Sequence, residues 1–410
     1  MVGSELLAGR ITDTNSRWLA GALAETGVRV VEIVKVGDDS GVIAVALRRL
    51  GKTADLVITS GGLGPTFDDV TFAAIARAVK RPLRLHAEAR AWLLEWRKVL
   101  AIRGRSFMAD TWRLQLRQAR LPAGAVALRN LRGSAPGLWL ETAGPVIIAL
   151  PGVPREMEGL FSEAVLPRLA ARADGAFASA HYRFAPLAES EVEAAIGATL
   201  KKLKNPEATV LARPGECSLI LRANAPSLKK AAALLHRTAA PLLKRLPAPF
   251  TDDGRDIELL VAERLANSGK TLALAESLTG GLIAARLTAI PGASQWLRGG
   301  AVVYTESAKQ ELGVPVALLK KHGAISAACA RALALAVQHR LDADFALATT
   351  GYAGPGGGDT RHSVGTYFVA VALPGGRVRV EKSLGIGSRE TVRQRAATHA
   401  LSLLLRQLKK

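Results

Sequence analysis

Short, strongly apolar segments alternate with helix-like segments over most of this 410-residue chain, and this alternation constrains the fold more than any other feature. Residues 28–36, 55–59 and 145–150 are apolar runs rich in Val and Ile, with the length of strands that are buried on both faces. Segments with helical periodicity, for example residues 15–26 and 42–50, separate them. Strands that alternate with helices form parallel sheets covered on both faces. The sequence therefore predicts the α/β class, with mostly parallel sheets in three-layer domains.

The texture of the sequence divides the chain into three regions. Residues 1–170 and 255–410 both show the strand–helix alternation, and no internal repeat links them. Residues 176–250 have the order strand, helix, strand, strand, helix, which is too short for a large catalytic core. Pro247 and Pro249 are typical of a linker. We therefore expect two α/β domains, joined by a small α+β domain of βαββα order.

The charge of the chain is strongly positive, because 55 Lys and Arg residues oppose 35 Asp and Glu residues, a net charge of +20. Residues 77–120 hold 12 basic and 3 acidic residues, and Trp92, Trp96 and Trp112 lie among them. Basic residues interleaved with aromatic ones are typical of a nucleic-acid surface. A solvated helix face whose tryptophans pack into a core has the same pattern, and we favour this second interpretation.

Cysteine usage and hydropathy indicate the cellular compartment in which the protein works. Cys217 and Cys329 lie far apart with no CxxC partner, so the sequence supports neither a disulfide framework nor a zinc site. No apolar run approaches the roughly 18–20 residues that a membrane-spanning helix needs. The amino-terminal residues lack the charged and apolar regions of a secretion signal. We expect a cytoplasmic protein with reduced thiols and no membrane contact.

A glycine-rich loop follows the predicted strand of residues 55–59, with the sequence Ser60-Gly61-Gly62-Leu63-Gly64-Pro65-Thr66-Phe67-Asp68-Asp69. Glycines at the carboxyl end of a parallel strand allow backbone N–H groups to approach a phosphate. Asp68 and Asp69 could hold a divalent cation that bridges phosphate oxygens. A tight turn with two acidic residues at a helix start explains the same residues equally well.

The loop from Gly61 to Thr71 resembles the GGLGPTxDDxT signature of the N-terminal domain of the competence/damage-inducible CinA family, a domain similar to molybdopterin-binding domains. Further segments match in family order: Gly3-Ser4-Glu5-Leu6-Leu7, Thr14-Asn15, Gly133-Ser134-Ala135-Pro136-Gly137 and Leu150-Pro151-Gly152-Val153-Pro154-Arg155-Glu156-Met157. The resemblance implies a metal-dependent hydrolysis of ADP-ribose to AMP and ribose 5-phosphate. It places the metal at Asp68 and Asp69 and the substrate at Asn15, Gly61, Gly62, Gly64 and Thr66.

Members of this family carry a short apolar strand ahead of the position of Val2-Gly3, where the present sequence begins. On this resemblance, either the chain starts further upstream than the present sequence, or the sheet of the N-terminal domain lacks its opening strand. The loss of an interior strand would leave backbone groups of its neighbours unpaired.

A candidate nucleophile lies in the third region. Ser277 follows an apolar strand, residues 271–275, and precedes Gly280-Gly281, so its hydroxyl should lie beside free backbone N–H groups. No histidine of the region belongs to a recognisable triad motif, whereas Lys309 follows Tyr304 by five residues. A desolvated lysine has a lowered pKa and can act as a base, although Glu306 close by would raise that pKa. A helix-capping serine and a solvated lysine are the simpler interpretation, and from these residues alone it is the favoured one.

The segment Ala275-Glu276-Ser277-Leu278-Thr279-Gly280-Gly281 resembles the AESxTGG motif of the CinA C-terminal domain, the nicotinamide mononucleotide deamidase family. Residues 291–294, 299–304, 322–326, 351–358 and 364–366 match in family order. The resemblance implies that Ser277 is the nucleophile and Lys309 its base, with Tyr304 assisting, and that no cofactor is needed. It also implies substrate contacts from Thr279 and Gly280.

The phosphate of such a substrate requires hydrogen-bond donors. Thr350, Gly351 and Gly354 belong to a glycine-rich stretch after a strand, where backbone N–H groups are available. Arg389 and Arg393 could add charge-assisted hydrogen bonds. A plain turn and a solvated helix face account for the same residues about as well.

We therefore expect a hydrolase that converts nicotinamide mononucleotide to nicotinate mononucleotide and ammonia, with a second, metal-dependent ADP-ribose pyrophosphatase activity. Its partners would be these small nucleotides, and we expect a homodimer. The alternative is a nucleic-acid-binding protein with vestigial enzyme domains, suggested by the basic stretches and by the KH-like order of residues 176–250. That region contains no GxxG loop of the kind that KH domains use to clamp a nucleic-acid backbone. A third hypothesis is that the protein has only the ADP-ribose pyrophosphatase activity of its N-terminal domain.

Overall fold

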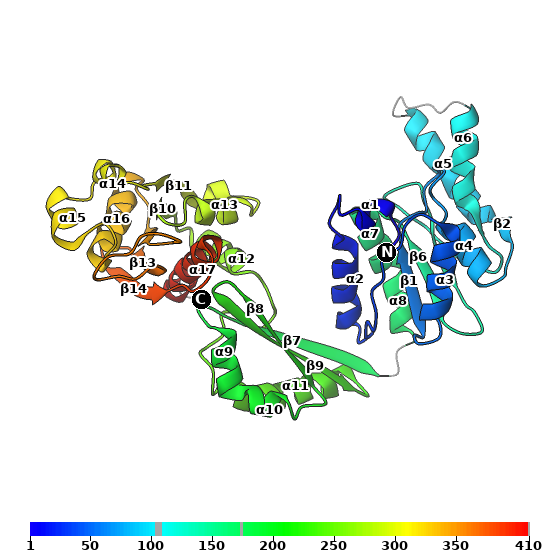
Figure 1. Cartoon of the computed structure of the whole chain (residues 1–410), viewed down its shortest axis with the longest axis horizontal. Helices are drawn as coiled ribbons and strands as arrows, with labels where there is room; N and C mark the ends of the chain where they lie inside the picture. Colours follow the sequence, from blue (N-terminus) through cyan, green and yellow to red (C-terminus); the bar gives the residue numbers. More distant parts are fainter. Residues whose placement is uncertain (103–108, 173–174, 409–410) are drawn as a thin grey trace. The chain divides into compact units, whose positions relative to one another are not determined.

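The computed structural model describes residues 1–102, 109–172 and 175–408. The chain divides into two compact units, which we call unit 1 (Met1–Phe177) and unit 2 (Ala178–Lys410) (Figure 1). Each unit is described by itself.

The helices and strands of unit 1 are, in chain order, α1 (Ser4–Leu7), α2 (Thr14–Glu25), α3 (Ser40–Leu50), β1 (Leu56–Ser60), α4 (Thr71–Ala78), β2 (Leu83–Leu85), α5 (Ala87–Ile102), α6 (Ala109–Gln115), β3 (Arg120–Pro122), β4 (Val126–Leu128), β5 (Gly137–Leu140), β6 (Val146–Leu150), α7 (Pro154–Leu160) and α8 (Leu166–Ala170).

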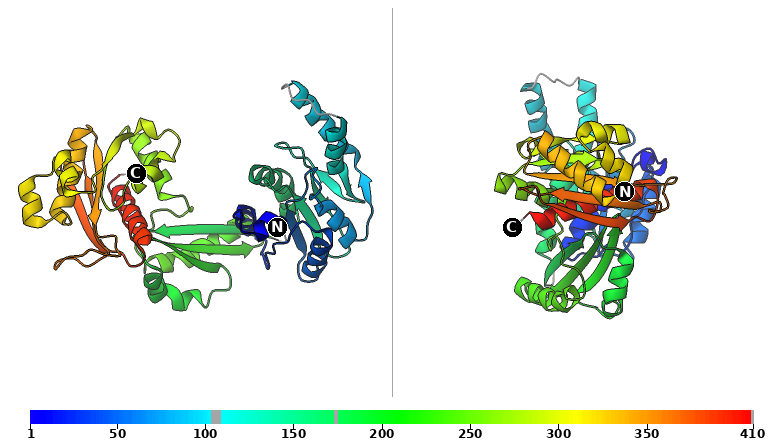
Figure 2. Two further views of the ribbon diagram at one scale, coloured as in Figure 1. Left: turned by 45° about the horizontal axis from the view of Figure 1, so that its top comes forward. Right: turned by 90° about the vertical axis from the view of Figure 1, so that its left-hand side faces the viewer.

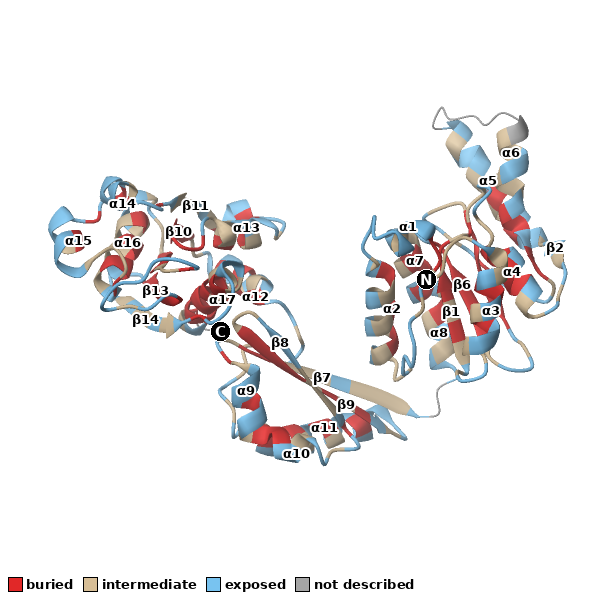
Figure 3. Ribbon diagram, viewed as in Figure 1, coloured by how far each residue is buried: buried red, intermediate tan, exposed pale blue. Residues whose placement is uncertain are grey.

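The main sheet of unit 1 has the strand order β1-β6-β5-β4. Strands β1 and β6 are parallel, and the remaining pairs are antiparallel. Along β6, Ile147 and Ala149 face the core cluster that includes residues of α3, α4 and α5, whereas Ile148 and Leu150 face a second cluster with α2 and α7. Figure 3 shows the buried strands between these helices. Unit 1 is therefore a three-layer α/β structure with a mixed sheet.

The free edge of β1 differs from the sequence-based expectation, because residues 28–36 do not form the strand that we predicted there. The first residues of the chain lie between this segment and the end of β1. The Val2 amide donates to the carbonyl of Ser60 (2.9 Å), the Val36 amide donates to that of Met1 (3.0 Å), and the Met1 ammonium donates to that of Val34 (2.7 Å). Only the single bridge between Val2 and Val36 is formed in this way.

A cavity of about 600 Å³ lies next to Met1, between β1 and the segment of residues 28–34. Its walls include Met1, Leu19, Leu23, residues 28–34 and residues 53–58. Among the described residues, the pairing of residues 28–36 is limited to the bridge at Val36, so the segment forms no ladder and no strand. Two apolar side chains of the segment are half exposed as a result, Val31 at 54% and Ile33 at 51%.

This cavity makes a prediction about stability. A segment of about six apolar, strand-forming residues joined ahead of Met1 would fill the cavity and pair with the free edge of β1. We expect the melting temperature of unit 1, measured by differential scanning calorimetry, to rise by about 3 °C or more. A Gly/Ser segment of the same length is the matched control and should give no rise. Equal melting temperatures for the two extended chains would contradict the prediction.

The basic stretch of residues 77–120 includes the helices α5 and α6, and its residues 103–108 lie outside the described part of the chain. Trp92 and Trp112 pack against the core of unit 1. Arg129 lies over the ring of Trp92 (5.8 Å to the centroid) and Arg97 over that of Trp112 (4.7 Å). These tryptophans are thus engaged in packing and cation–π contacts, which supports the interpretation of a solvated helix face over that of a stacking platform for bases.

Unit 2 contains β7 (Ala176–Phe184, which begins in unit 1), α9 (Glu189–Val192), α10 (Ala198–Leu200), β8 (Glu207–Arg213), β9 (Glu216–Ala225), α11 (Leu228–Leu243), α12 (Ile257–Ser268), β10 (Leu272–Glu276), α13 (Leu282–Thr288), β11 (Leu297–Val302), α14 (Glu306–Leu312), α15 (Val316–His322), α16 (Ala327–Arg340), β12 (Phe345–Gly351), β13 (Thr366–Ala372), β14 (Val378–Leu384) and α17 (Arg389–Gln407).

The sheet of residues 272–384 has the order β11-β10-β12-β13-β14. Strand β10 is parallel to both of its neighbours, and the pairs β12–β13 and β13–β14 are antiparallel. Strand β14 was not recognised in the sequence, because its charged residues alternate with apolar ones and its pattern is not that of a fully buried strand. Together with the main sheet of unit 1, this arrangement confirms the α/β class and shows that both of these sheets contain parallel and antiparallel pairs.

Leu and Ala residues alternate along β10, so that one face of this sheet carries large side chains and the other carries small ones. On β10, Leu272 and Leu274 face the cluster of α12, α13 and α17, whereas Ala273 and Ala275 face the cluster of α16. The left view of Figure 2 shows α17 and α16 on opposite sides of the strands. Because alanine has the smallest apolar side chain, α16 can pack close to its face of the sheet. This use of alanine explains how a chain with 5% aromatic residues fills its core.

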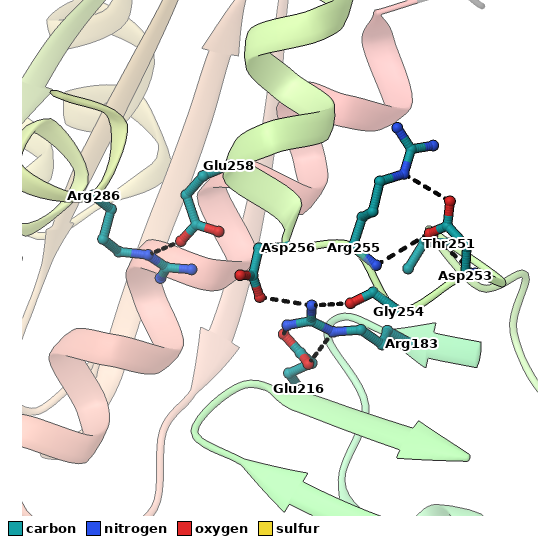
Figure 4. A network of polar contacts seen from close by, with 9 residues as sticks. All are labelled: Arg183, Glu216, Thr251, Asp253, Gly254, Arg255, Asp256, Glu258 and Arg286. Carbon is teal, nitrogen blue, oxygen red and sulfur yellow. Dashed lines mark hydrogen bonds and ion pairs between the residues drawn. The ribbon is translucent and has the colours of Figure 1, made fainter. Parts of the chain in front are cut away.

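Strands β7, β9 and β8 form a separate three-stranded sheet on which α11 packs. A buried ion pair ties this sheet to the segment that leads into α12 (Figure 4). Arg183 of β7 bonds both carboxylate oxygens of Glu216 (2.7 and 2.8 Å), and it also bonds the carbonyl of Gly254 (2.9 Å) and the carboxylate of Asp256 (2.7 Å). A bidentate pair of this kind fixes geometry, since removal of one partner leaves a buried charge. Among the described residues, no helix is long and apolar enough to cross a membrane.

Candidate active site

The turn that carries Ser277 joins β10 to α13. Gly280 and Gly281 have φ angles of 60° and 89°, a left-handed conformation that side chains rarely adopt. The buried carboxylate of Glu276 accepts hydrogen bonds from the amides of Ile283 (3.1 Å) and Ala284 (2.8 Å) in the first turn of α13. The turn is therefore fixed at both ends, by the strand and by this carboxylate. Glu276 was part of the motif but was not among our predicted functional residues.

Ser277 and Lys309 are in direct contact, with 3.1 Å between the hydroxyl oxygen and the side-chain nitrogen. Helix α14 begins at Glu306 with the hydroxyl of Thr305 as its N-cap, and this start places Lys309 in the first turn. The nitrogen of Lys309 also donates to the carbonyls of Val303 (2.9 Å) and Tyr304 (3.4 Å). The side chain is thus held toward Ser277 by backbone acceptors.

Burial changes the chemistry of this lysine. Lys309 is only 3% exposed, and desolvation lowers its pKa from the ordinary value of 10.5 against the opposing effects of Cys329 and Glu306. Burial also raises the pKa of Cys329 to about 11, so this thiol is neutral at physiological pH and gives Lys309 no anionic partner. The expected effect of Glu306 is therefore present but smaller than the desolvation. A lysine with a lowered pKa beside a serine hydroxyl is the arrangement required for a general base.

Threonines surround the serine on the side of β12. Because β10 and β12 pair in register, Glu276 lies opposite Thr349, and the Ser277 amide donates to the Thr349 carbonyl (3.1 Å). The hydroxyls of Thr279 and Thr349 are 2.8 Å apart. Our sequence analysis selected Thr350 instead, whose hydroxyl donates to the carbonyl of Ala324 (2.8 Å). The strand register that singles out Thr349 depends on which strands are neighbours, and the sequence does not contain this information directly.

The predicted arginines lie on the first two turns of α17. Arg393 donates to the carbonyl of Thr279 (2.9 Å) and pairs with Glu390 (3.0 Å). Arg389 donates to the carbonyl of Gly354 (2.8 Å) and contacts the hydroxyl of Tyr304. The structure thus brings these arginines to the serine turn and to the glycine-rich stretch. Gly351 ends β12, where an added Cβ would lie 2.6 Å from that of Tyr367.

In unit 1, the other glycine loop brings its predicted residues together at the end of β1. Gly61 and Gly62 have φ angles of 105° and 68°, and an added Cβ on Gly61 would lie 2.3 Å from the carbonyl oxygen of Val2. The amide nitrogen of Asn15 donates to the hydroxyl of Ser60 (3.0 Å) and to the carbonyl of Gly152 (2.7 Å). The amide oxygen of Asn15 is buried without a partner among the described residues. An unpartnered buried acceptor is the kind of group that a ligand can satisfy.

The two acidic residues of this loop are turned toward Thr66. Its backbone amide donates to Asp69 (2.8 Å), and its hydroxyl contacts both Asp68 and Asp69. In the described ranges, no group of three or more His, Cys, Asp and Glu side chains is placed to hold a metal ion. Two carboxylates suit a magnesium-like ion that takes its remaining ligands from a phosphate substrate and water, and they do not suit a metal held by protein alone. Gly64 lies against Asp69 in the same loop.

Both units contain regions that match family models of known proteins. Residues 255–408 match the family model of the CinA C-terminal domain, and residues 1–171 match that of a probable molybdopterin binding domain. A CinA-like protein of Solibacter usitatus (strain Ellin6076) is 37% identical over 99% of this chain and 97% of its own length. The chain belongs to the CinA family.

Other relatives and solved structures carry related names. A putative competence-damage inducible protein of Moorella thermoacetica (strain ATCC 39073 / JCM 9320) is 38% identical to this CinA-family chain over 99% of it and 97% of the relative. The crystal structure of the competence damage-inducible protein A of Klebsiella pneumoniae subsp. pneumoniae MGH 78578 is 33% identical, with 37% of this chain and 94% of that chain covered and a TM-score of 0.36. The competence/damage inducible protein CihA of Agrobacterium tumefaciens is 36% identical, with 38% and 97% covered and a TM-score of 0.36.

The contact between Ser277 and Lys309 makes a prediction about reactivity. An aryl sulfonyl fluoride should label Ser277, because Lys309 accepts the proton of the hydroxyl as the S–O bond forms, the S–F bond breaks and fluoride leaves. We expect the labelling rate, measured by mass spectrometry, to fall about 100-fold or more in Lys309→Met. The matched control is Lys321→Met, which alters an exposed lysine of α15 and should leave the rate unchanged. Equal labelling of the chain and of Lys309→Met would show that the lysine does not activate the serine.

Proposed function

We propose that this protein hydrolyses the carboxamide of nicotinamide mononucleotide to give nicotinate mononucleotide and ammonia. The observation that carries the proposal is the 3.1 Å contact between Ser277 and Lys309 inside a desolvated site. The family to which the chain belongs, and the matched positions of both residues in its motif, support the same reaction.

The residues act in two half-reactions. The neutral amine of Lys309 accepts the proton of Ser277 while the serine oxygen attacks the carboxamide carbon. The resulting ammonium of Lys309 returns the proton to the departing nitrogen, ammonia leaves, and an ester of nicotinate mononucleotide with Ser277 remains. Lys309 then accepts a proton from water, the hydroxide attacks the ester carbon, and the proton passes back to Ser277 as nicotinate mononucleotide leaves. The hydrogen bonds from Lys309 to Val303 and Tyr304 keep the amine in place for both steps.

Features around the serine favour a substrate with an anionic group. Arg389 and Arg393 lie one helical turn apart on α17 and contact the glycine-rich stretch and the serine turn. Guanidinium groups and backbone N–H groups are the usual donors to phosphate. A mononucleotide supplies both the carboxamide for the serine and a phosphate for these donors.

The direct test is ammonia release from nicotinamide mononucleotide by the purified chain. We expect turnover by the unaltered protein and a loss of about 1,000-fold or more in Ser277→Ala, because the nucleophile is absent. Ser307→Ala is the matched control, since Ser307 is an exposed serine of α14, and it should retain full activity. Equal rates for the protein and Ser277→Ala would eliminate the serine mechanism, and no release by the unaltered protein would eliminate the function.

We propose a second activity for unit 1, namely a metal-dependent hydrolysis of ADP-ribose to AMP and ribose 5-phosphate. The specific observation that favours it is the unpartnered, buried amide oxygen of Asn15 beside a glycine loop with two carboxylates. The carboxylates of Asp68 and Asp69 would hold a divalent metal, which supplies charge stabilisation at the diphosphate. Thr66 orients both carboxylates, and Gly61 and Gly62 allow the loop to approach the end of β1.

For this second activity we expect AMP formation from ADP-ribose only when Mg²⁺ or Mn²⁺ is added. Asp68→Asn should reduce the rate at least about 100-fold, because the metal loses an anionic ligand. Ammonia release from nicotinamide mononucleotide should be unchanged in the same variant. Turnover that is equal with and without chelator, or equal in Asp68→Asn, would contradict the assignment.

A further inference from the structure

Two backbone amides directly after Ser277 have no hydrogen-bond acceptor in the described part of the chain. They belong to Leu278 and Thr279, residues that are only 2% and 0% exposed. Buried backbone N–H groups are almost always paired, so two consecutive donors without a partner are the kind of group that a ligand can satisfy. The amide of Ser277 itself is occupied, because it donates to the carbonyl of Thr349 (3.1 Å). The free donors therefore lie one and two residues beyond the nucleophile.

The position of these donors suits the charge that forms in the reaction. When Ser277 attacks the carbon of a carboxamide, negative charge moves onto the carboxamide oxygen, and donors fixed in advance around that oxygen stabilise the transition state more than the ground state. The Gly280 amide donates to the carbonyl of Ser277 (3.0 Å), so Leu278 and Thr279 are the two central residues of a closed turn. Their amides take no part in closing the turn and remain available to the oxygen. How well they serve depends on how firmly the turn is held.

The hydroxyl of Thr349 holds this turn from the neighbouring strand β12. It lies 2.8 Å from the hydroxyl of Thr279 and 3.4 Å from the amide nitrogen of Ser277. Thr349 is fully buried like Thr279, and the Thr279 hydroxyl makes no second hydrogen bond among the described residues. Strand β12 lies between β10 and β13 in the centre of its sheet. The pair of hydroxyls thus ties a residue with a free amide to a rigid element.

We propose that the amides of Leu278 and Thr279 bind the carboxamide oxygen in the transition state, and that Thr349 is the positioning residue that fixes them. Thr349 acts through Thr279 and does not touch the substrate. Neither threonine gains or loses a proton, so Lys309 keeps its role as the base. This inference rests on the proposed deamidase function, which it deepens by assigning the groups that stabilise the developing negative charge.

The substitution Thr349→Val keeps the shape of the side chain and removes its hydroxyl, so Thr279 loses its partner. We expect kcat for ammonia release from nicotinamide mononucleotide to fall at least about tenfold, because the donors are less firmly placed. KM should stay within about twofold. Thr349→Ser, which keeps a hydroxyl at this position, should have a kcat within about threefold of the unaltered chain. The apparent pKa of kcat/KM should not move in Thr349→Val, since the contacts of Lys309 are unchanged.

Two further variants test the same contact. Thr279→Val removes the pair of hydroxyls from its other side and should lower kcat as much as Thr349→Val, and the double variant should fall no further. Thr279→Val supplies the test if Thr349→Val does not fold. Thr398→Val is the matched control, because this threonine is buried (4%) on α17 and its hydroxyl accepts from Arg286 (2.9 Å). The control should leave kcat unchanged.

Labelling of Ser277 by an aryl sulfonyl fluoride separates this inference from the deamidase function. A sulfonyl oxygen takes the place of the carboxamide oxygen at the two amides while the Ser277 oxygen bonds to sulfur and fluoride leaves. We expect the labelling rate to fall at least about tenfold in Thr349→Val and to be retained in Thr349→Ser. This labelling pattern without ammonia release by the unaltered chain would remove the deamidase reaction and leave the role of Thr349 standing.

Several results would overturn the proposal. An unchanged kcat or labelling rate in Thr349→Val, rates for Thr349→Ser as low as those of Thr349→Val, or an equal loss in Thr398→Val would each do so. A raised KM with unchanged kcat would assign Thr349 to substrate binding instead. A shift of the apparent pKa toward 10.5 in Thr349→Val would show that the substitution admits water to Lys309 and that the role of Thr349 is a general structural one.

Discussion

The contact between Ser277 and Lys309 can serve as a pair of nucleophile and base because the lysine is removed from water, and the proposed chemistry of the C-terminal region depends on this pair. A solvated lysine would be protonated at neutral pH and could not accept the proton of the serine. Here the amine is almost fully buried, its neighbouring thiol is neutral, and its hydrogen bonds go to carbonyl oxygens. The same burial that costs folding free energy for a charged amine lowers the pKa of Lys309 and favours the neutral form that the proposed reaction needs.

The fold supplies this burial through small side chains. The alanine face of β10 and β12 lets α16 approach the sheet, and Cys329 in the first turn of α16 lies on the same buried side as Lys309. The parallel neighbours of β10 bring Val303 and Thr349 to either side of the serine turn. Glu276 then fixes the start of α13. The site is thus assembled at the carboxyl ends of parallel strands, where α/β sheets bind their ligands.

Much of the site could be predicted from the sequence, because its residues belong to short motifs whose chemistry is local. Ser277, Lys309 and Arg393 lie where the motif and the spacing suggested. Thr349 could not be predicted, since its place beside the serine turn depends on the register between β10 and β12, whose paired residues are more than 70 positions apart. The role of Glu276 was missed although its hydrogen bonds to the amides of Ile283 and Ala284 are local. The contact between Tyr304 and Arg389 joins residues 85 positions apart. In unit 1, the apolar run at residues 28–36 had the composition of a strand but lacked a neighbour to pair with. The composition of a segment indicates that it can form a strand, but whether the strand forms depends on a neighbouring strand to pair with.

The most direct test of the central claim is the pH dependence of kcat/KM for ammonia release from nicotinamide mononucleotide. The base must be neutral, so activity should be low at acidic pH, rise with pH, and level off at an apparent pKa below the ordinary lysine value of 10.5. The sign follows from desolvation, which favours loss of the proton from Lys309 at a lower pH. A profile that is flat, that falls as the pH rises, or that rises only around pH 10.5 would contradict the account of a buried, neutral Lys309 as the base.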